Sequence, residues 1–375
     1  MLPVQELVSF GGLPKVMILT EELITEKNQT SITEFVLIGF SNHPKLQIPL
    51  FIIFLFIYTI TLTGNILIIL VTTMDPALQN PMYFFLRNLS SLEICFNLVI
   101  VPKMLTNFLI EKKNISYAGC ATQMYFFFFF GAAECCLLAA MAYDRYVAIC
   151  NPLRYLDIMN RRACFQLAAA SWFSGFPVSI VQTTWIFSLP FCGPNTVNHF
   201  FCDSPPVLEL ACADTHMFEI EALSATVLFI MFPFLLILLT YVRIIVAILR
   251  IPSAEGRHKA FSTCSSHLVV VTLFYGTATS TYFRPKSNYS PDTKKILSLS
   301  YTIITPMLNP IIYSLRNKEY KSLLCKTIKK HFGAMTTYCL VIVSEEAEMI
   351  KQDIDKTTPL ELLWKNRLGN WKVGC

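Results

Sequence analysis

The chain has 375 residues, of which 54% are hydrophobic, 13% aromatic and only 15% charged. Soluble globular domains carry about 25% charged residues, so the composition excludes a soluble globular protein. The formal net charge is a modest +5, which fits anionic membrane lipid and acidic partner surfaces and gives no indication of nucleic-acid binding.

Seven apolar stretches follow one another along the chain. Five contain no charged residue, and two are interrupted only by Glu134 or by Arg87 and Glu93. A helix needs roughly 20 mostly apolar residues to cross the bilayer core, and the sixth stretch reaches that length with the uncharged residues 261–267 before it. The pattern predicts an all-α membrane protein, a seven-transmembrane helix bundle. The stretches are Leu46–Met74, Tyr83–Val101, Cys120–Ala142, Cys164–Gly193, Ala222–Val242, Leu268–Phe283 and Ile296–Leu315.

The basic residues of the connections predict the orientation. They gather between spans three and four, between spans five and six, and after span seven, and such loops are cytoplasmic by the positive-inside rule. Seven crossings then place the N-terminus outside, and the sequons at Asn28, Asn114 and Asn288 fall on that side. Asn28 is the expected glycosylation site. The sequon at Asn88 lies inside span two, where no glycosylation is expected.

Four segments organise the chain. Residues 1–45 are an expected extracellular tail, residues 46–316 the seven-span domain, residues 317–332 a short amphipathic helix on the inner membrane surface, and residues 333–375 an atypical cytoplasmic tail. The first span is expected to act as the insertion signal, because Met1–Thr20 lacks the apolar core of a signal peptide.

Prolines interrupt several of the predicted spans. Pro177, Pro233, Pro306 and Pro310 would each kink a helix and free a backbone carbonyl. Asn309, directly before Pro310, would place an amide at the bend.

The triplet Asp144-Arg145-Tyr146 stands at the end of the third apolar stretch. Ionisable residues at membrane depth are costly and mark functional sites. The acid and the base can pair, and the cost is tolerated only while the pair is held. We therefore expect a releasable ion pair, a switch, at this membrane face. An arginine that extends its charged end into the interface is the alternative.

Four longer strings, taken in order, resemble a known family. They are similar to motifs of vertebrate olfactory receptors, which are rhodopsin-like (class A) G-protein-coupled receptors, and the subgroup is similar to the tetrapod-type family-10 odorant receptors. The likeness runs from about Asn28 to Phe332. The strings are Pro81-Met-Tyr-Phe-Phe-Leu86, Met141-Ala-Tyr-Asp-Arg-Tyr-Val-Ala-Ile-Cys150-Asn-Pro-Leu153, Lys259-Ala-Phe-Ser-Thr-Cys-Ser-Ser-His267 and Pro306-Met-Leu-Asn-Pro-Ile-Ile-Tyr-Ser-Leu-Arg-Asn317.

The resemblance implies a receptor and not an enzyme. Such receptors bind a small odorant, couple to a stimulatory (olfactory) heterotrimeric G protein that raises cyclic AMP, and lie in the plasma membrane of olfactory sensory neuron cilia. Both tails depart from the family pattern, which puts residues 1–16 and the residues after Phe332 in doubt, with Met17 as an alternative start.

The resemblance also implies a G-protein switch at the inner face. Arg145 would pair with Asp144 at rest and meet the G protein in the active state, when Tyr241 and Tyr313 reach toward it. For Tyr241 a tyrosine of the interfacial belt is an equal alternative. The residues implied in the switch are Asp144, Arg145, Tyr146, Tyr241, Asn309, Pro310 and Tyr313.

Two acids, Glu93 and Glu134, lie deep in spans two and three, and with Asn65 and Asn309 they would form a polar cluster at mid-membrane. Two close carboxyl groups either share a proton or bind a cation. Related receptors keep a sodium ion there, so the resemblance favours a structural sodium ion, with a shared proton as the alternative. No other cofactor is expected.

Four of the 13 cysteines, Cys120, Cys192, Cys202 and Cys212, fall on the predicted outer side. An even number of cysteines in an oxidising compartment predicts two disulfides, but the spacing does not fix the pairs. The family pattern implies Cys120–Cys202 and Cys192–Cys212, with Cys120–Cys212 as the competing pair. A copper or zinc site built with His199 is disfavoured, because disulfides use up the thiols.

The resemblance implies a ligand pocket in the outer half of the bundle, between spans three, five, six and seven, and helical spacing places its span-three residues on one face. Its lining would be apolar and aromatic, with a few hydroxyls and no charge, which suits a small, neutral, mostly hydrophobic volatile. For each residue singly, ordinary helix packing is an equal interpretation. Tyr275-Gly276 would be the lever through which the ligand moves span six. The lining residues are Phe127, Phe128, Gly131, Ala132, Ala225, Thr226, Phe229, Tyr275, Ala278, Thr279, Tyr282 and Thr302.

Other classes of protein fit the sequence less well. A channel or transporter would need charges along a path or an internal repeat, and the sequence offers only Glu93 and Glu134. An intramembrane enzyme would need a nucleophile with a base, and His267 stands at the inner edge of its span without partners in the pattern. A receptor for a small metabolite outside the nose, and a receptor silenced by its tails, are the remaining alternatives.

Overall fold

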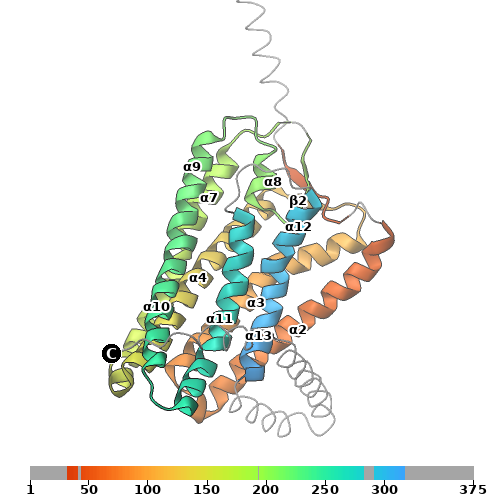
Figure 1. Cartoon of the computed structure of the whole chain (residues 1–375). Helices are drawn as coiled ribbons and strands as arrows, with labels where there is room; N and C mark the ends of the chain where they lie inside the picture. Colours follow the sequence, from red (N-terminus) through yellow and green to blue (C-terminus); the bar gives the residue numbers. More distant parts are fainter. Residues whose placement is uncertain (1–31, 41–43, 193, 283–290, 317–375) are drawn as a thin grey trace, which may run out of the picture.

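Seven long helical segments run side by side in the computed structural model, which describes residues 32–40, 44–192, 194–282 and 291–316 (Figure 1). Within that part of the chain, six segments are long and apolar enough to cross a membrane. The seventh, α11, has 29 residues and begins with a polar stretch. The predicted seven-helix bundle is confirmed. The segments are α2 (Gln47–Met74), α3 (Pro81–Leu109), α4 (Tyr117–Cys150), α6 and α7 (Arg161–Phe173, Gly175–Ser188), α9 and α10 (His216–Thr226, Phe232–Leu249), α11 (Ala254–Tyr282), and α12 and α13 (Pro291–Leu299, Thr305–Arg316).

Polar caps begin three of these helices a few residues before the apolar stretches. Asn80 accepts a hydrogen bond from the backbone N–H of Tyr83, and Pro81 occupies the first turn of α3. Ser116 accepts from the N–H of Gly119 in α4, and Asn160 caps α6 in the same way. Each cap satisfies a backbone donor that the first helical turn leaves open.

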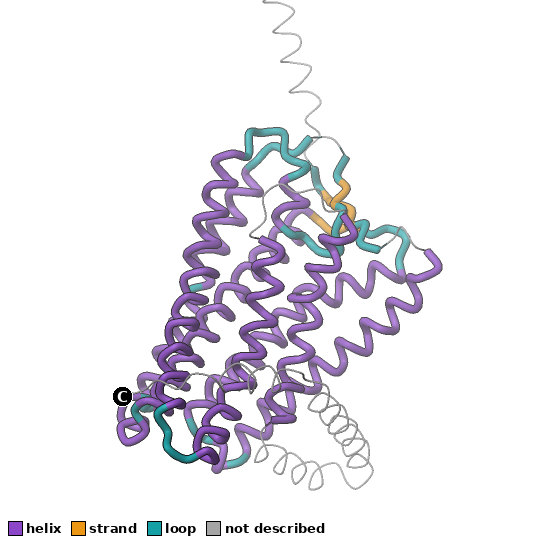
Figure 2. The backbone as a smooth tube through the Cα atoms, in the orientation of Figure 1, coloured by secondary structure: helices purple, strands orange, loops and turns teal. Residues whose placement is uncertain are grey.

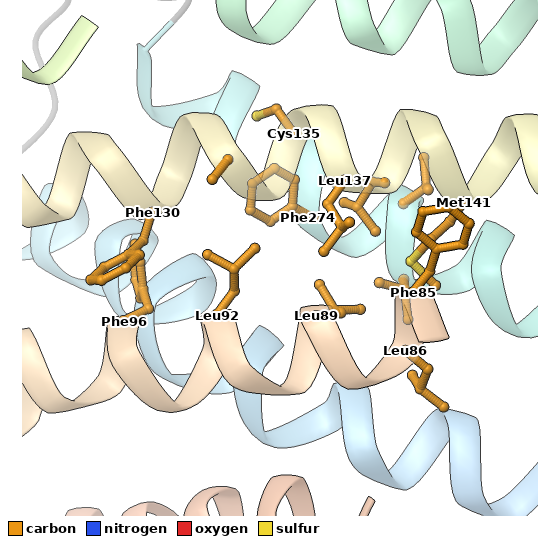
Figure 3. Close-up of a cluster of buried hydrophobic side chains, with 14 of the residues drawn as sticks. Phe85, Leu86, Leu89, Leu92, Phe96, Phe130, Cys135, Leu137, Met141 and Phe274 are labelled. Carbon is orange, nitrogen blue, oxygen red and sulfur yellow. The ribbon is translucent and has the colours of Figure 1, made fainter. Parts of the chain in front are cut away.

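The segment α4 is the central helix of the bundle. In its most apolar window 67% of the residues are buried inside the protein, against 22% for α2 and 11% for the span of α9 and α10. Figure 3 shows Leu89, Leu92 and Phe96 of α3 pointing toward Phe130 and Leu137 of α4. The peripheral helices direct their apolar side chains outward, as expected of surfaces that meet lipid.

A glycine allows one close approach to the central helix. The span of α6 and α7 is interrupted only at Ser174, whose backbone keeps a helical conformation, and Gly175 begins α7 directly against α4. A Cβ atom at Gly175 would lie 2.4 Å from the backbone oxygen of Phe129 and 2.8 Å from its ring. Only a residue without a side chain fits this contact.

Proline reshapes two spans without ending them. A π-helical turn, Val227–Met231, lies directly before α10, whose second residue is Pro233. A second π-helical turn, Ser300–Ile304, lies directly before α13, whose second residue is Pro306. A proline clashes with the carbonyl four residues earlier, and a widened turn relieves the clash. Those two carbonyls belong to Phe229 and Thr302, both predicted lining residues.

One end of the bundle carries a three-stranded sheet that the all-α prediction missed (Figure 2). Its central strand β1 (Glu34–Leu37) pairs antiparallel with β2 (Asn114–Ser116) and parallel with β3 (Thr196–Val197). Phe35 and Leu37 of β1 are fully buried. We call this the sheet end and the opposite end of α4 the Arg145 end; the two are about 40 Å apart at the rise of an α-helix.

The remaining described elements are two short α-helices, α5 (Tyr155–Ile158) at the Arg145 end and α8 (Ser204–Leu208) at the sheet end, and three 3-10 turns, Pro44–Leu46, Pro76–Leu78 and Pro152–Arg154. The predicted amphipathic helix at 317–332, the tail at 333–375 and the sequons at Asn28 and Asn288 lie outside the described residues.

Candidate functional site

The charged pair in the last turns of α4 is buried, with side chains of Asp144 and Arg145 only 1% and 6% exposed. Asp144 Oδ1 accepts a hydrogen bond of 2.8 Å from the hydroxyl of Tyr155 on α5. No ion pair joins Asp144 to Arg145 within the described chain, although the two groups are electrostatic neighbours, and the pair expected at rest stays a prediction. Consecutive helical residues point about 100° apart and do not face each other. Tyr146, the third residue of the triplet, is half-buried and lies against Tyr143.

Tyr155 is a functional candidate that the sequence prediction missed. It follows span three in a connection, and burial together with the Asp144 carboxylate raises the pKa of its hydroxyl above the usual value. The tyrosine therefore remains a proton donor to Asp144 at any physiological pH. Its position, eleven residues after the acid, gives no local signal in the sequence.

Arg145 lies among the predicted switch tyrosines. It is within electrostatic reach of Tyr241, Tyr313 and His267, and its Nε is buried without a hydrogen-bond partner in the described residues. The hydroxyl of Tyr313 is likewise buried and unpartnered in the described chain. The structure thus gathers unsatisfied polar groups from spans three and seven at one place.

His267 has partners, contrary to the prediction from its sequence position. Its Nδ1 lies 2.8 Å from the hydroxyl of Tyr241, and its Nε2 lies 3.2 Å from the backbone oxygen of Leu138. The ring is fully buried and links spans three, five and six near Arg145. The signal in the sequence is a histidine placed directly before an uncharged apolar run.

The acids at mid-membrane come together as predicted. Asn309 donates a hydrogen bond to Glu93 Oε1, and the Glu93 and Glu134 side chains lie within hydrogen-bonding reach of each other. Glu93 Oε2, Glu134 Oε1 and Asn309 Oδ1 are buried oxygens without a hydrogen-bond partner among the residues that the structure describes. Asn65, the remaining predicted member of the cluster, is buried in α2 and donates to the backbone oxygen of Thr61 in its own helix. No group of three or more His, Cys, Asp or Glu side chains within the described residues is placed to hold a metal ion.

Two disulfides fix the long loop at the sheet end. The structure joins Cys120 to Cys202, which ties the loop to α4, and Cys192 to Cys212, which closes the loop on itself. These are the pairs that the family pattern implied. Gln123 adds a second link, since its Oε1 accepts from the backbone N–H of Cys202 at 2.9 Å.

The two described sequons differ in environment. Asn114 lies in β2, and its Nδ2 donates to Glu34 at 2.9 Å. Asn88 lies inside α3 and accepts a hydrogen bond from the Trp172 indole at 3.1 Å, which gives it a packing role between spans two and four.

The predicted ligand lining is brought together in part. Phe127 of α4 lies 5.0 Å from Phe201 of the loop and 6.1 Å from Tyr301 of span seven, measured between ring centroids. Phe201 and Tyr301 were not predicted. A Cβ atom on the half-buried Gly131 would meet nothing within 4 Å, so there is free space on this side of α4. Of the predicted residues Ala132, Ala278 and Thr302 are also buried, and Phe128, Ala225, Thr226, Phe229 and Thr279 are half-buried.

Tyr275 connects span six to span three. Its hydroxyl donates to the backbone oxygen of Cys135 at 3.1 Å, and its ring lies 4.9 Å from that of Phe234 in span five. Gly276 beside it is exposed, so the space next to the glycine opens outward. The side chain of Tyr282 lies outside the described part of the chain.

Comparison with known proteins adds sequence and fold relatives. A family model described as olfactory receptor matches residues 54–331. Human olfactory receptor 10A4 is 69% identical over 309 residues, covering 82% of this chain and 98% of that receptor. Human olfactory receptor 10A7 is 65% identical over 302 residues, covering 80% and 96%. The structure is similar to the crystal structure of squid rhodopsin, with a TM-score of 0.59 and 18% identity over 77% of this chain and 86% of that one.

Proposed function

This chain belongs to the olfactory receptor family, whose members are receptors and not enzymes, and from that premise we propose that it binds a small, mostly apolar volatile within the helix bundle and activates a stimulatory heterotrimeric G protein that raises cyclic AMP. The observation that carries the proposal is the aromatic contact of Phe127 with Phe201 and Tyr301, beside the free space at Gly131. Apolar walls with few polar groups are what a small volatile requires.

The sheet end would face the outside of the cell. Both disulfides lie there, and disulfides persist in oxidising compartments. The Arg145 end then faces the cytoplasm, in agreement with the basic connections. The protein is a multi-pass membrane protein, and its proposed location is the plasma membrane of olfactory sensory neuron cilia.

Activation would be a population shift between two arrangements of the bundle. A ligand changes the equilibrium only by binding one arrangement better than the other. Tyr275 reaches from span six to span three next to the proposed ligand site, while His267 joins the same spans near Arg145. A ligand that displaces the Tyr275 hydroxyl from Cys135 would also bias the His267 contact with Leu138. Arg145, whose Nε has no hydrogen-bond partner among the described residues, would then become available to the G protein.

A sodium ion would hold the mid-membrane cluster in one of these arrangements. Glu93, Glu134 and Asn309 each present a buried oxygen that has no hydrogen-bond partner in the described part of the chain, and oxygen is the ligand that hard cations prefer. The ion would neutralise the two carboxylates. A shared proton is the competing state of the same pair.

The test is a cyclic AMP reporter assay in cells that express the full chain, screened against a panel of volatiles. Arg145→Ala is run in parallel, and Arg154→Ala, an exposed arginine of the following connection, is the matched control. We expect a ligand-dependent rise in cyclic AMP that Arg145→Ala lowers at least about tenfold. Surface staining must show equal receptor levels. A full response from Arg145→Ala at equal surface level would contradict the proposed switch.

A further inference from the structure

Lys295 near the start of span seven is almost completely buried. Its side chain is 1% exposed, whereas its neighbour Lys294 is 53% exposed and pairs with Glu209 at the surface. Lysine is almost never fully buried unless it is paired. The partner that the structure gives Lys295 is Asp292, whose carboxylate lies 3.3 Å away and is itself 64% exposed.

This pairing compensates the buried ammonium only in part. Removing a charge from water costs several kcal/mol, and an ion pair with a solvent-exposed partner restores little of that. A buried cation with an exposed partner is therefore receptive to a second anion that approaches from inside the protein.

A second polar group beside Lys295 has an unused position. His199 in the disulfide-bonded loop is 2% exposed, and its Nδ1 has no hydrogen-bond partner within the described chain. Burial, and next the Lys295 ammonium, lower the pKa of His199 to about 3, so the two groups are electrostatic neighbours and the ring is neutral at physiological pH. A neutral imidazole can donate from Nδ1 to an incoming oxygen.

Both groups adjoin the aromatic lining proposed for the ligand. Lys295, Ser298 and Thr302 are all buried, and their spacing places them on one face of span seven, toward the interior. The His199 ring lies 4.7 Å from Phe201, which in turn lies 5.0 Å from Phe127. The chain of contacts runs from the two polar groups into the apolar part of the site.

We propose that Lys295 and His199 form the polar end of the ligand site and that the ligand is a small carboxylate with an apolar chain or ring. Its carboxylate would pair with the Lys295 ammonium and accept a hydrogen bond from His199 Nδ1, while its apolar part lies against Phe127 and Phe201. This inference rests on the proposed odorant site for the position of the apolar part, and it replaces the expected uncharged lining with one that carries a cation.

The signalling test compares octanoate with octanol, and phenylpropanoate with phenylpropanol, on the full chain in cells. We expect each acid to act at a concentration at least about tenfold lower than its alcohol, a preference worth about 1.4 kcal/mol. Lys295→Met should abolish that preference and Lys295→Arg should retain it. Lys294→Met is the matched control and should leave it unchanged. An acid preference that survives Lys295→Met would overturn the inference.

A binding test separates this site from the signalling proposal. Ligands that bind the folded state raise its stability. Octanoate should therefore raise the thermal unfolding midpoint of the purified full chain more than octanol does, in the wild type and in Lys294→Met but not in Lys295→Met. Stabilisation without any cyclic AMP response would keep the carboxylate site and reject the proposed signalling. Equal effects of octanoate and octanol on the wild type would reject the carboxylate site, whatever the signalling result.

Discussion

His267 joins three spans through the two nitrogens of one ring, with Tyr241 on one side and the Leu138 carbonyl on the other. Its side chain is fully buried, so both hydrogen bonds are made where water cannot replace them. Such a group rigidifies its surroundings when satisfied and is costly when one partner is removed.

The first prediction concerns this contact. Tyr241→Phe leaves the imidazole Nδ1 without its partner and should cost about 1–3 kcal/mol of stability, as should His267→Phe. The double variant should lose less than the sum, with a coupling of about 0.5–3 kcal/mol. Thermal unfolding of the purified receptor in detergent measures all four proteins. Strict additivity would show that the hydrogen bond contributes nothing.

The second prediction is a dependence of stability on pH through His199. Its folded pKa of about 3 lies below the usual value of 6.5, and the depression comes from burial and from Lys295. Well above pH 6.5 the ring is neutral in the folded and in the unfolded protein, so its titration does not change the free energy of unfolding. As the pH falls below 6.5, the ring binds a proton in the unfolded chain but not in the folded protein. The free energy of unfolding therefore falls by up to about 1.4 kcal/mol per pH unit.

At about pH 5 the loss in the free energy of unfolding caused by His199 amounts to roughly 2 kcal/mol relative to neutral pH. The unfolding midpoint of the wild type should therefore fall more steeply with acidification than that of His199→Gln, which has no titrating ring. Parallel pH profiles for the two proteins would mean that the ring is solvated and titrates normally.

At the scale of elements, the helices depend on a few positions where backbones meet. Gly175 lets the beginning of α7 contact the backbone of α4, and the two π-helical turns absorb Pro233 and Pro306. The widened turns also decide which way the side chains within them point, including Phe229 and Thr302.

The third prediction compares two glycines. Gly175→Ala should destabilise the receptor by about 1–3 kcal/mol, because the new methyl group meets a backbone oxygen at 2.4 Å that cannot rotate away. Gly131→Ala is the matched control: its methyl group meets nothing within 4 Å, and alanine favours the helix by about 0.5–1 kcal/mol. The two unfolding midpoints should move in opposite directions. A neutral Gly175→Ala would mean that α7 shifts freely along α4.

The sequence predicted the spans because hydrocarbon imposes a minimum apolar length that can be read directly. It predicted the contact of Asn309 with Glu93, but neither β1 nor the partners of Asp144 and His267. Four residues, Glu34–Leu37, carry no strong strand signal, and their partners Asn114 and Thr196 lie far along the chain. Likewise the hydrogen bond from Tyr155 to Asp144 was not predicted, since the direction of a side chain around its helix and not adjacency in the sequence decides contact.

At the scale of the whole molecule, the sheet end is held by a second hydrophobic cluster separate from the main core. Phe35 stands at its centre, with ring centroids 5.9 Å from Tyr117 and 5.6 Å from Phe191. The Cys120–Cys202 disulfide belongs to the same cluster. This cluster therefore connects the N-terminal strand to the loop that carries His199 and Phe201.

The fourth prediction tests that connection. Phe35→Ala removes a fully buried ring and should cost about 3–5 kcal/mol of local stability. Because β1 would loosen from β2 and β3, hydrogen exchange of the loop around Val197 should accelerate. Thr33→Ala, at an exposed position directly before β1, should change neither the stability nor the hydrogen exchange. Unchanged exchange in Phe35→Ala would show that the loop is held by its disulfides alone.

The sheet also has a consequence for biosynthesis. Its central strand leaves the ribosome first, yet Asn195, which donates a hydrogen bond to Glu34, is synthesised 161 residues later. During that interval β1 has no completed sheet to join, because loop closure over such a distance must await the fourth span. Closure of this sheet is thus a late step, and β1 is made before its two partner strands but reaches its final place only after β3 has been synthesised.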